Sequence, residues 1–223
     1  MTPDHARPDA AWTIIIPVKD TRVAKTRLSR LSQPVRAALA LAFAMDSATA
    51  ALECPAVLRV LVVTNDRDAG VALEAAGAQV IPDASDSGLN AALTHGVSTV
   101  RREDPAAAVA AMSGDLPALR SEDLTLAFLA GSALPHWFVA DAEGSGTTLL
   151  AAGPGTGLSP SFGARSREAH AGLAAVEIVG PDLARLRRDV DTEEHLRKAV
   201  RLGVGRFTRA ALADLELASS PRT

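Results

Sequence analysis

Trp12-Thr-Ile-Ile-Ile-Pro-Val18 decides the fold of this chain. It is a short, continuous apolar run rich in β-branched side chains, which is typical of a strand buried on both faces. Val57–Val63 (VLRVLVV) has the same character, and residues 79–81 and 107–112 are predicted as further strands. The first half of the chain therefore predicts four strands of a buried sheet.

Helical segments are predicted between and after these strands, at 34–52, 68–76, from 87 or 88 to about 100, and at 121–129. Strand and helix thus alternate four times, which indicates a parallel sheet covered by helices on both faces. Ligands of such sheets bind beyond the carboxyl ends of the strands. We therefore expect the functional residues in the polar stretches that follow the strands.

The second half predicts an extension of this sheet. Residues 136–140, 147–152 and 176–179 are strand-like, and a helix begins after Asp191 and ends before Gly203. The expected fold is α/β, with a mostly parallel mixed sheet in a single domain.

The domain is predicted to span residues 12–217. Residues 1–11 and 218–223 are expected to be a flexible N-terminus and a flexible tail.

Composition excludes several function classes. The chain has 223 residues, 23 Lys and Arg against 26 Asp and Glu, and a net charge of −3, which disfavours a protein that covers nucleic-acid phosphates. One cysteine, Cys54, excludes an internal disulfide, and the five histidines lack metal-binding spacing. The N-terminus resembles no secretory signal, and no continuous apolar run reaches the length of a membrane span. We expect a cytoplasmic protein with no nucleic-acid or membrane partner, and a homodimer stays possible.

Three cations follow the first strand: Lys19, Lys25 and Arg27. Lysine and arginine at the carboxyl end of a strand suit the phosphates of a ligand. The patterns GxxxxGK[ST] and GxGxxG are absent, so no glycine-rich phosphate cradle is predicted. A solvated basic loop without function is the alternative.

Three aspartates are candidate metal ligands. Asp115 follows the strand 107–112 in the turn Gly114-Asp115-Leu-Pro117, and Asp189 and Asp191 lie two residues apart, on one face of an extended segment. Mg²⁺ prefers carboxylates together with substrate phosphates. The alternative is that Asp115 belongs to a turn and that Asp191 caps the helix that follows it.

Small and hydroxyl residues gather in two loops, Gly144–Thr148 and Ser161–Ser166. Backbone N–H groups in such loops can approach an anion, and the hydroxyl groups add donors. Ordinary turns are the alternative.

Taken in order, PVK…AKTRL, LVVT, GLNAAL, GDLP, GTT, SFG and DVDT resemble the guanylyltransferases of coenzyme F-420 biosynthesis, the CofC/FbiD family. The resemblance runs from about Ile14 to Gly205. It implies a fold similar to nucleotide-diphospho-sugar transferases, and transfer of GMP from GTP to phosphoenolpyruvate, 2-phospho-L-lactate or 3-phospho-D-glycerate. Sugar nucleotidyltransferases usually carry a glycine-rich loop where this chain has PVKDTRVAKTR, which favours the guanylyltransferase family.

The resemblance also implies roles for individual residues. Lys19, Lys25 and Arg27 would contact the triphosphate of GTP, with Thr64, Asn90 and Gly114 also on the nucleotide side. Asp115, Asp189 and Asp191 would hold Mg²⁺, and Lys19, Lys25, Arg27 and Asp115 would be the catalytic set. Thr148, Gly163 and Ser166 would bind the acid phosphate.

A phosphate monoester is already an anion at neutral pH, so its transfer needs charge neutralisation and positioning rather than a general base. Two alternatives stay open. One is another nucleotidyltransferase, with CTP or with a sugar-phosphate or molybdopterin acceptor. The other is a nucleotide-binding module without catalysis, for which three metal-capable aspartates would be unnecessary.

Overall fold

The computed structural model describes residues 12–84 and 88–219. Within them the strands are β1 (Trp12–Pro17), β2 (Val57–Val63), β3 (Gln79–Ile81), β4 (Ala108–Met112), β5 (His136–Ala140), β6 (Thr147–Ala152) and β7 (Val176–Glu177). The helices are α1 (Gln33–Leu52), α2 (Arg67–Ala75), α3 (Leu89–Glu103), α4 (Ser121–Ala130), α5 (Ser166–Gly172), α6 (Glu193–Leu202) and α7 (Arg206–Ser219), with the 3-10 helices η1 (Thr21–Val23) and η2 (Pro181–Leu183). Of the segments expected to be flexible, residues 1–11 and 220–223 lie outside the described residues.

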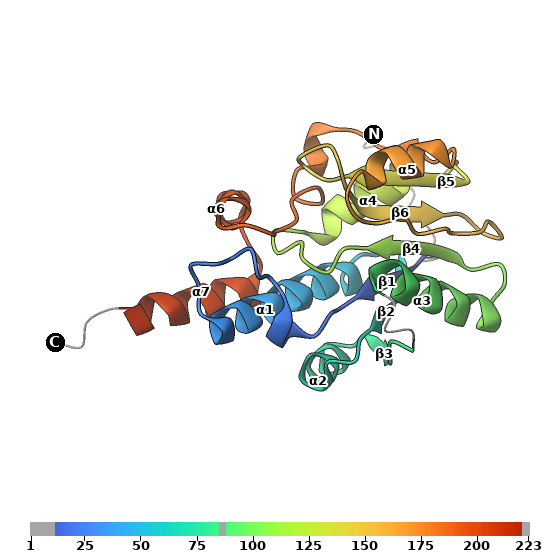
Figure 1. Cartoon of the computed structure of the whole chain (residues 1–223). Coiled ribbons are helices and arrows are strands. Elements are labelled where there is room, and N and C mark those ends of the chain that lie inside the picture. The colour runs from blue at the N-terminus through green and yellow to red at the C-terminus, as the bar shows by residue number, and fades with distance from the viewer. Residues whose placement is uncertain (1–11, 85–87, 220–223) are drawn as a thin grey trace, which may run out of the picture.

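The seven described strands form one sheet in the order β3-β2-β1-β4-β6-β5-β7, and Figure 1 labels all of them except β7. β1 pairs in parallel with both β2 and β4, and β3 and β7 also pair in parallel with their neighbours. β6 runs antiparallel to β4 and to β5. The predicted α/β fold with a mostly parallel mixed sheet is confirmed.

β1 is buried on both faces, as its sequence predicted. Ile14 and Ile16 belong to the core under α1, α2 and α4, whereas Ile15 belongs to the opposite core under α3. Each fully buried isoleucine contributes about 1.5–3 kcal/mol relative to an exposed one. The continuous apolar run therefore explains why β1 lies in the interior of the sheet, between β2 and β4. The candidate functional residues follow its carboxyl end.

Helix α1 is 20 residues long and, by length and average hydropathy, could cross a membrane. The sequence contains no uninterrupted apolar run of that length, because polar residues such as Asp46 interrupt it. In the structure 61% of the most apolar 18-residue stretch of α1 is buried inside the protein. Packing against the sheet and against α7 accounts for that apolar composition.

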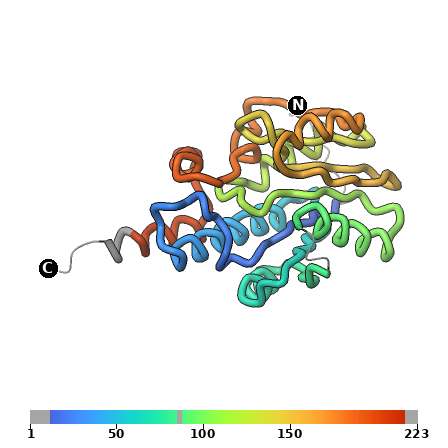
Figure 2. Tube along the Cα trace, in the orientation of Figure 1, coloured from blue at the N-terminus to red at the C-terminus, as the bar shows by residue number. Residues whose placement is uncertain are grey.

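Segments far apart in the chain meet beside the carboxyl ends of β1 and β4. The tube in Figure 2 shows the loop after β1 lying next to the segment that leads into α6. The backbone N–H of Arg30 donates to Glu193 at 3.1 Å across this junction, and Leu28 and Val190 share a small buried cluster. This junction forms the floor of the candidate site.

Helix α7 was not predicted from the sequence. It lies along α1, and its first backbone N–H groups, at Phe207 and Thr208, donate to the buried carboxylate of Asp46 at 3.0 and 2.9 Å. An aspartate in the middle of α1 thus caps a helix about 160 residues further on. No local pattern in the sequence signals such a long-range cap.

Candidate active site

The turn after β4 presents Asp115. Its neighbour Gly114 lies so close to β1 that a Cβ atom there would be 3.1 Å from Ile16 Cγ2 and 3.3 Å from the carbonyl oxygen of Pro17. The turn is tied to β6 by the Ser113 N–H, which donates to the Thr148 carbonyl at 2.9 Å. Close backbone approach therefore explains the glycine and fixes the position of Asp115.

The segment Asp189–Asp191 lies beside this turn. The backbone N–H of Val190 donates to the carbonyl oxygen of Asp115 at 3.1 Å, while the Val190 side chain is buried. This register brings both flanking aspartates to the carboxylate of Asp115. The three residues predicted as metal ligands are therefore close together in the structure, although about 75 residues separate Asp115 from the other two.

Lys25 lies between two of these carboxylates. Its ammonium group contacts Asp115 Oδ2 and lies 3.1 Å from Asp191 Oδ1, and its side chain is only 11% exposed. The residue adopts a left-handed backbone conformation with φ 55°.

Two hydrogen bonds steady the loop that carries Lys25. The Thr21 N–H and hydroxyl donate to Asp66 Oδ2 at 2.8 and 2.6 Å. Asp66 itself caps α2 by accepting from Asp68 and Ala69. The loop after β1 is therefore anchored to the end of β2 as it crosses the site.

The three charged groups respond differently to this crowding. Burial disfavours the Lys25 ammonium, but the carboxylates of Asp115 and Asp191 outweigh it and hold the pKa of Lys25 above its usual range. Burial alone would raise the pKa of Asp191, yet Lys25, Arg27 and His195 lower it. For Asp189, burial and then the like charges of Asp115 and Asp191 raise the pKa to about 7. Among these carboxyl groups Asp189 is the one whose pKa is raised, because the causes acting on it are burial and neighbouring negative charges.

The structure adds two residues that the sequence did not single out. Glu143, in the turn between β5 and β6, and His195, in the first turn of α6, lie with Asp189 so that one ligand atom of each is within 4.8 Å of the others. Among the described residues Asp189 Oδ1 is buried and has no hydrogen-bond partner. Carboxylate oxygens with a buried, unpaired member fit a divalent cation, so the residues present here are suited to hold one.

The other expected nucleotide-side residues lie around this centre. Arg27 is 75% exposed, with its guanidinium 3.7 Å from Asp191 Oδ2, and Lys19 is exposed directly after β1. Thr64 is buried at the end of β2, where its hydroxyl accepts from the Asp66 N–H at 3.0 Å. Asn90, near the start of α3, uses its side-chain amide on the backbone of Phe162.

Of the three residues expected to bind the acid phosphate, Thr148 lies on β6, Gly163 in the loop before α5 and Ser166 at the first position of α5. Thr148 and Ser166 are almost completely buried, and among the described residues the Ser166 hydroxyl has no hydrogen-bond partner. Gly163 has φ +130°, a conformation that favours glycine. The Ser166 N–H donates to the Gly163 carbonyl at 3.1 Å, which joins these two residues in one turn.

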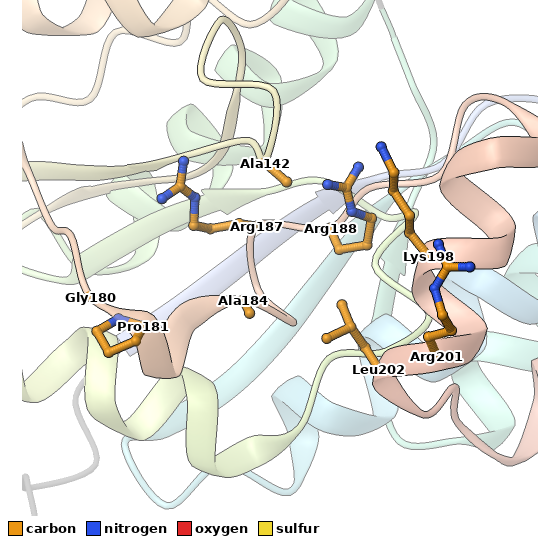
Figure 3. A pocket seen from close by; sticks show the side chains of 9 residues that line it. All are labelled: Ala142, Gly180, Pro181, Ala184, Arg187, Arg188, Lys198, Arg201 and Leu202. Atoms are coloured by element: carbon orange, nitrogen blue, oxygen red, sulfur yellow. The ribbon is translucent and has the colours of Figure 1, made fainter.

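A basic hollow of about 510 Å³ lies between the segment before α6 and α6 itself (Figure 3). Four cations line it: Arg187 and Arg188 before α6, and Lys198 and Arg201 on α6. Arg188 donates to Glu143 at 2.6 Å, and Lys198 pairs with Glu194 at 2.9 Å. Glu143 therefore contacts both an arginine of this basic surface and the cluster with Asp189 and His195. Sequence analysis did not identify the hollow.

A mostly parallel mixed sheet with carboxylates and a buried lysine at its carboxyl edge is typical of nucleotidyltransferases with the nucleotide-diphospho-sugar transferase fold. Two solved structures share this fold. A 4-diphosphocytidyl-2C-methyl-D-erythritol synthase aligns over 86% of this chain and 98% of its own, with TM-score 0.55 and 14% identity. A putative nucleotide-diphospho-sugar transferase from Desulfovibrio desulfuricans aligns over 86% and 77%, with TM-score 0.53 and 15% identity.

The profile of the family described as "Guanylyl transferase CofC like" matches residues 12–223. The chain is 49% identical over 213 residues to the phosphoenolpyruvate guanylyltransferase of Thermomonospora curvata, covering 96% of this chain and 93% of that one. It is 48% identical over 208 residues to the enzyme of the same name from Streptomyces coelicolor, covering 93% and 98%. The chain belongs to the CofC-like guanylyl transferase family, so the predicted family and enzyme class are confirmed.

Proposed function

We propose that this protein transfers GMP from GTP to phosphoenolpyruvate and releases pyrophosphate, as a step of coenzyme F-420 biosynthesis. One observation carries the proposal: Asp115, Asp189 and Asp191 lie close together at the carboxyl edge of the sheet, and Lys25 pairs with Asp115 and Asp191. The printed names of the relatives support the guanylyl donor and the phosphoenolpyruvate acceptor. 2-Phospho-L-lactate is the alternative acceptor, and 3-phospho-D-glycerate a third.

In this proposal the cations after β1 hold the triphosphate. Lys25 is buried and fixed by two carboxylates, so it offers a positioned charge. Lys19 and Arg27 are exposed, and Arg27 is held only by a 3.7 Å contact with Asp191, so both can move toward a ligand. Gly114 allows close approach at the turn, and Thr64 holds the end of β2 on the nucleotide side. Positioned positive charge stabilises the charge that builds on the phosphates during transfer.

Asp115, Asp189 and Asp191 would hold Mg²⁺, and Glu143 and His195 lie close enough to Asp189 to contribute. When bound, the ion would neutralise charge on the phosphates and orient them. The unpaired, buried oxygen of Asp189 and its raised pKa support this role, because a cation there would offset the repulsion between the carboxylates.

The acceptor reacts without a general base. Its phosphate oxygen attacks the α-phosphorus of GTP, a new bond forms between them, and the bond from the α-phosphorus to the bridging oxygen breaks as pyrophosphate leaves. Thr148, Gly163 and Ser166 are proposed to orient the acid phosphate. Among the described residues the Ser166 hydroxyl has no hydrogen-bond partner, so it can donate a hydrogen bond to the phosphate. Alignment of the two phosphates supplies much of the rate gain.

Pyrophosphate release by the purified protein tests the proposal. Mg²⁺ and GTP are supplied with phosphoenolpyruvate, 2-phospho-L-lactate or 3-phospho-D-glycerate in separate reactions, and CTP replaces GTP in a parallel set. Release with GTP and phosphoenolpyruvate supports the proposal, and release with another acid alone reassigns the acceptor. No release in any reaction, with GTP still bound, would favour a nucleotide-binding module.

A cytoplasmic location is part of the same proposal, since GTP and phosphoenolpyruvate are cytoplasmic metabolites and the lone Cys54 is a buried free thiol. A homodimer is left to measurement of the solution mass.

A further inference from the structure

The backbone of Ser161 and Phe162 is held by two side chains from different helices. The Ser161 N–H donates to His170 Nε2 on α5 at 3.0 Å. The Phe162 N–H donates to Asn90 Oδ1 on α3 at 2.7 Å, and the Phe162 carbonyl accepts from Asn90 Nδ2 at 2.9 Å. Three backbone groups of the two residues directly before Gly163 are thus fixed by hydrogen bonds to side chains.

The tautomer of His170 follows from these contacts. Because Nε2 accepts from Ser161, the ring proton is on Nδ1, which donates to Thr147 Oγ1 at 2.9 Å. The ring is completely buried and lies edge-on to Phe162, with centroids 5.4 Å apart. Burial lowers the pKa of His170 to about 4, so the ring stays neutral and keeps this orientation at neutral pH. His170 therefore joins β6, α5 and the loop in one arrangement.

Asn90 pairs with Phe162 through both polar atoms of its side chain. A side-chain amide that bonds to both the N–H and the carbonyl of one residue resembles the paired bonds between two residues of a β-ladder, and this geometry engages both polar atoms of the side chain. The resemblance to the family put Asn90 on the nucleotide side. In the structure its amide bonds to the loop that carries the proposed acceptor residues.

We propose that Asn90 and His170 are positioning residues for the acid-phosphate acceptor, which fix Ser161 and Phe162 so that Gly163 and Ser166 present their polar groups to it. Neither side chain touches the acceptor. This inference rests on the proposed function, because it takes Gly163 and Ser166 as the acceptor subsite. Asn90 also lies at the start of α3, which packs against β1 and β2, so the same side chain ties the acceptor loop to the helix that covers these strands.

The chain provides a matched control. It contains two asparagines, and the other one, Asn65, makes the same pair of bonds with a different loop: Nδ2 donates to the Asp83 carbonyl at 2.9 Å, and Oδ1 accepts from the Asp83 N–H at 3.0 Å. Asn65→Ala removes an equivalent pair of hydrogen bonds away from Ser161–Gly163. Comparing Asn65→Ala with Asn90→Ala thus separates the effect of a general loss of stability from the effect of losing the position of the Ser161–Gly163 loop.

Steady-state kinetics with GTP and phosphoenolpyruvate test the inference. Asn90→Ala is expected to raise the KM for phosphoenolpyruvate on the order of tenfold, with the KM for GTP within about twofold of wild type. His170→Asn, which cannot reach Ser161, should do the same, and His170→Gln should restore much of the acceptor KM because its longer amide can accept from the Ser161 N–H. Asn65→Ala should leave the acceptor KM unchanged.

A rise in the GTP KM alone for Asn90→Ala would overturn the inference and assign Asn90 to the nucleotide. An unchanged acceptor KM in a folded Asn90→Ala protein would also overturn it. Hydrogen exchange of the wild-type and Asn90→Ala proteins gives a readout that does not depend on activity, with faster exchange expected at Ser161 and Phe162. If no acid phosphate is a substrate, the proposed function fails, and unchanged exchange at these amides would then overturn the loop assignment as well.

Discussion

The backbone N–H of Val190 donates to the carbonyl oxygen of Asp115 at 3.1 Å, and this one bond joins the turn after β4 to the segment before α6. It sets the register in which Asp189 and Asp191 flank Asp115. The Val190 side chain is buried in a cluster that includes Leu28 and Leu196. The three aspartates are therefore positioned by backbone geometry and apolar packing. Among the described residues the Asp189 Oδ1 atom has no hydrogen-bond partner and is available for a ligand.

Asp115→Asn should reduce turnover by a factor on the order of 10² at saturating Mg²⁺, the scale for losing one electrostatic stabiliser. The substitution keeps the shape of the side chain but removes the charge that faces Lys25 and the proposed metal. Asp182→Asn, at an exposed carboxylate in η2, is the control and should leave turnover unchanged. Near-normal turnover of Asp115→Asn would remove Asp115 from the catalytic set.

Asp189→Asn should stabilise the metal-free protein at pH 8 and abolish the stabilisation by Mg²⁺. The folded-state pKa of Asp189 is raised to about 7, so the group costs little stability near pH 4, costs more as pH rises toward 7, and has its full cost at pH 8. Removing its charge should then raise the free energy of unfolding by about 1–3 kcal/mol after allowance for screening.

Thermal unfolding with and without Mg²⁺ measures both effects of Asp189→Asn. Wild type should show a higher Tm in Mg²⁺, whereas the variant should have a higher Tm than wild type without it and no further rise with it. An equal Mg²⁺ shift in the two proteins would exclude Asp189 as a ligand. Asp182→Asn serves again as the charge-matched control.

His170 should make the protein less stable as pH falls from about 6.5 to 4. Burial lowers its folded-state pKa to about 4, so in this window the unfolded chain binds a proton that the folded protein does not. The loss amounts to roughly 3 kcal/mol across the window. Protonation of Asp189 makes the protein more stable as pH falls over nearly the same pH range. The effect of His170 is therefore isolated as the difference in free energy of unfolding between His170→Gln and wild type, measured by urea unfolding at each pH. A constant difference would contradict the burial of a neutral ring.

Local patterns in the sequence were sufficient for the sheet and its main helices. The run Trp12–Val18 predicted β1 because burial on both faces leaves a continuous apolar signal, and the same holds for β2. The three aspartates could be proposed because two of them share a short extended segment and the third follows a strand. Their meeting depends on the Val190–Asp115 bond, which no local pattern specifies.

The parts that sequence analysis missed are those made by single long-range contacts. Glu143 is in an ordinary Gly-rich turn and His195 is in the first turn of a helix, and only the fold brings them to Asp189. Asn90 was associated with the nucleotide through its motif, and its pairing with Phe162, 72 residues away, leaves no trace in either segment. Such pairs depend on tertiary structure rather than on composition or periodicity.

Asp46→Ala should reduce the free energy of unfolding by about 2 kcal/mol, because it removes both acceptors from the first N–H groups of α7. The Asp46 carboxylate is buried in the middle of α1 and accepts from Phe207 and Thr208 at 3.0 and 2.9 Å. Asp46→Asn keeps one carbonyl acceptor and should lose less. Urea unfolding compares the three proteins, and trypsin should cut Asp46→Ala after Arg206, in the first turn of α7, faster than wild type. Equal stability of Asp46→Ala and wild type would show that water replaces this cap without cost, and that α7 is held by its apolar contacts with α1 alone.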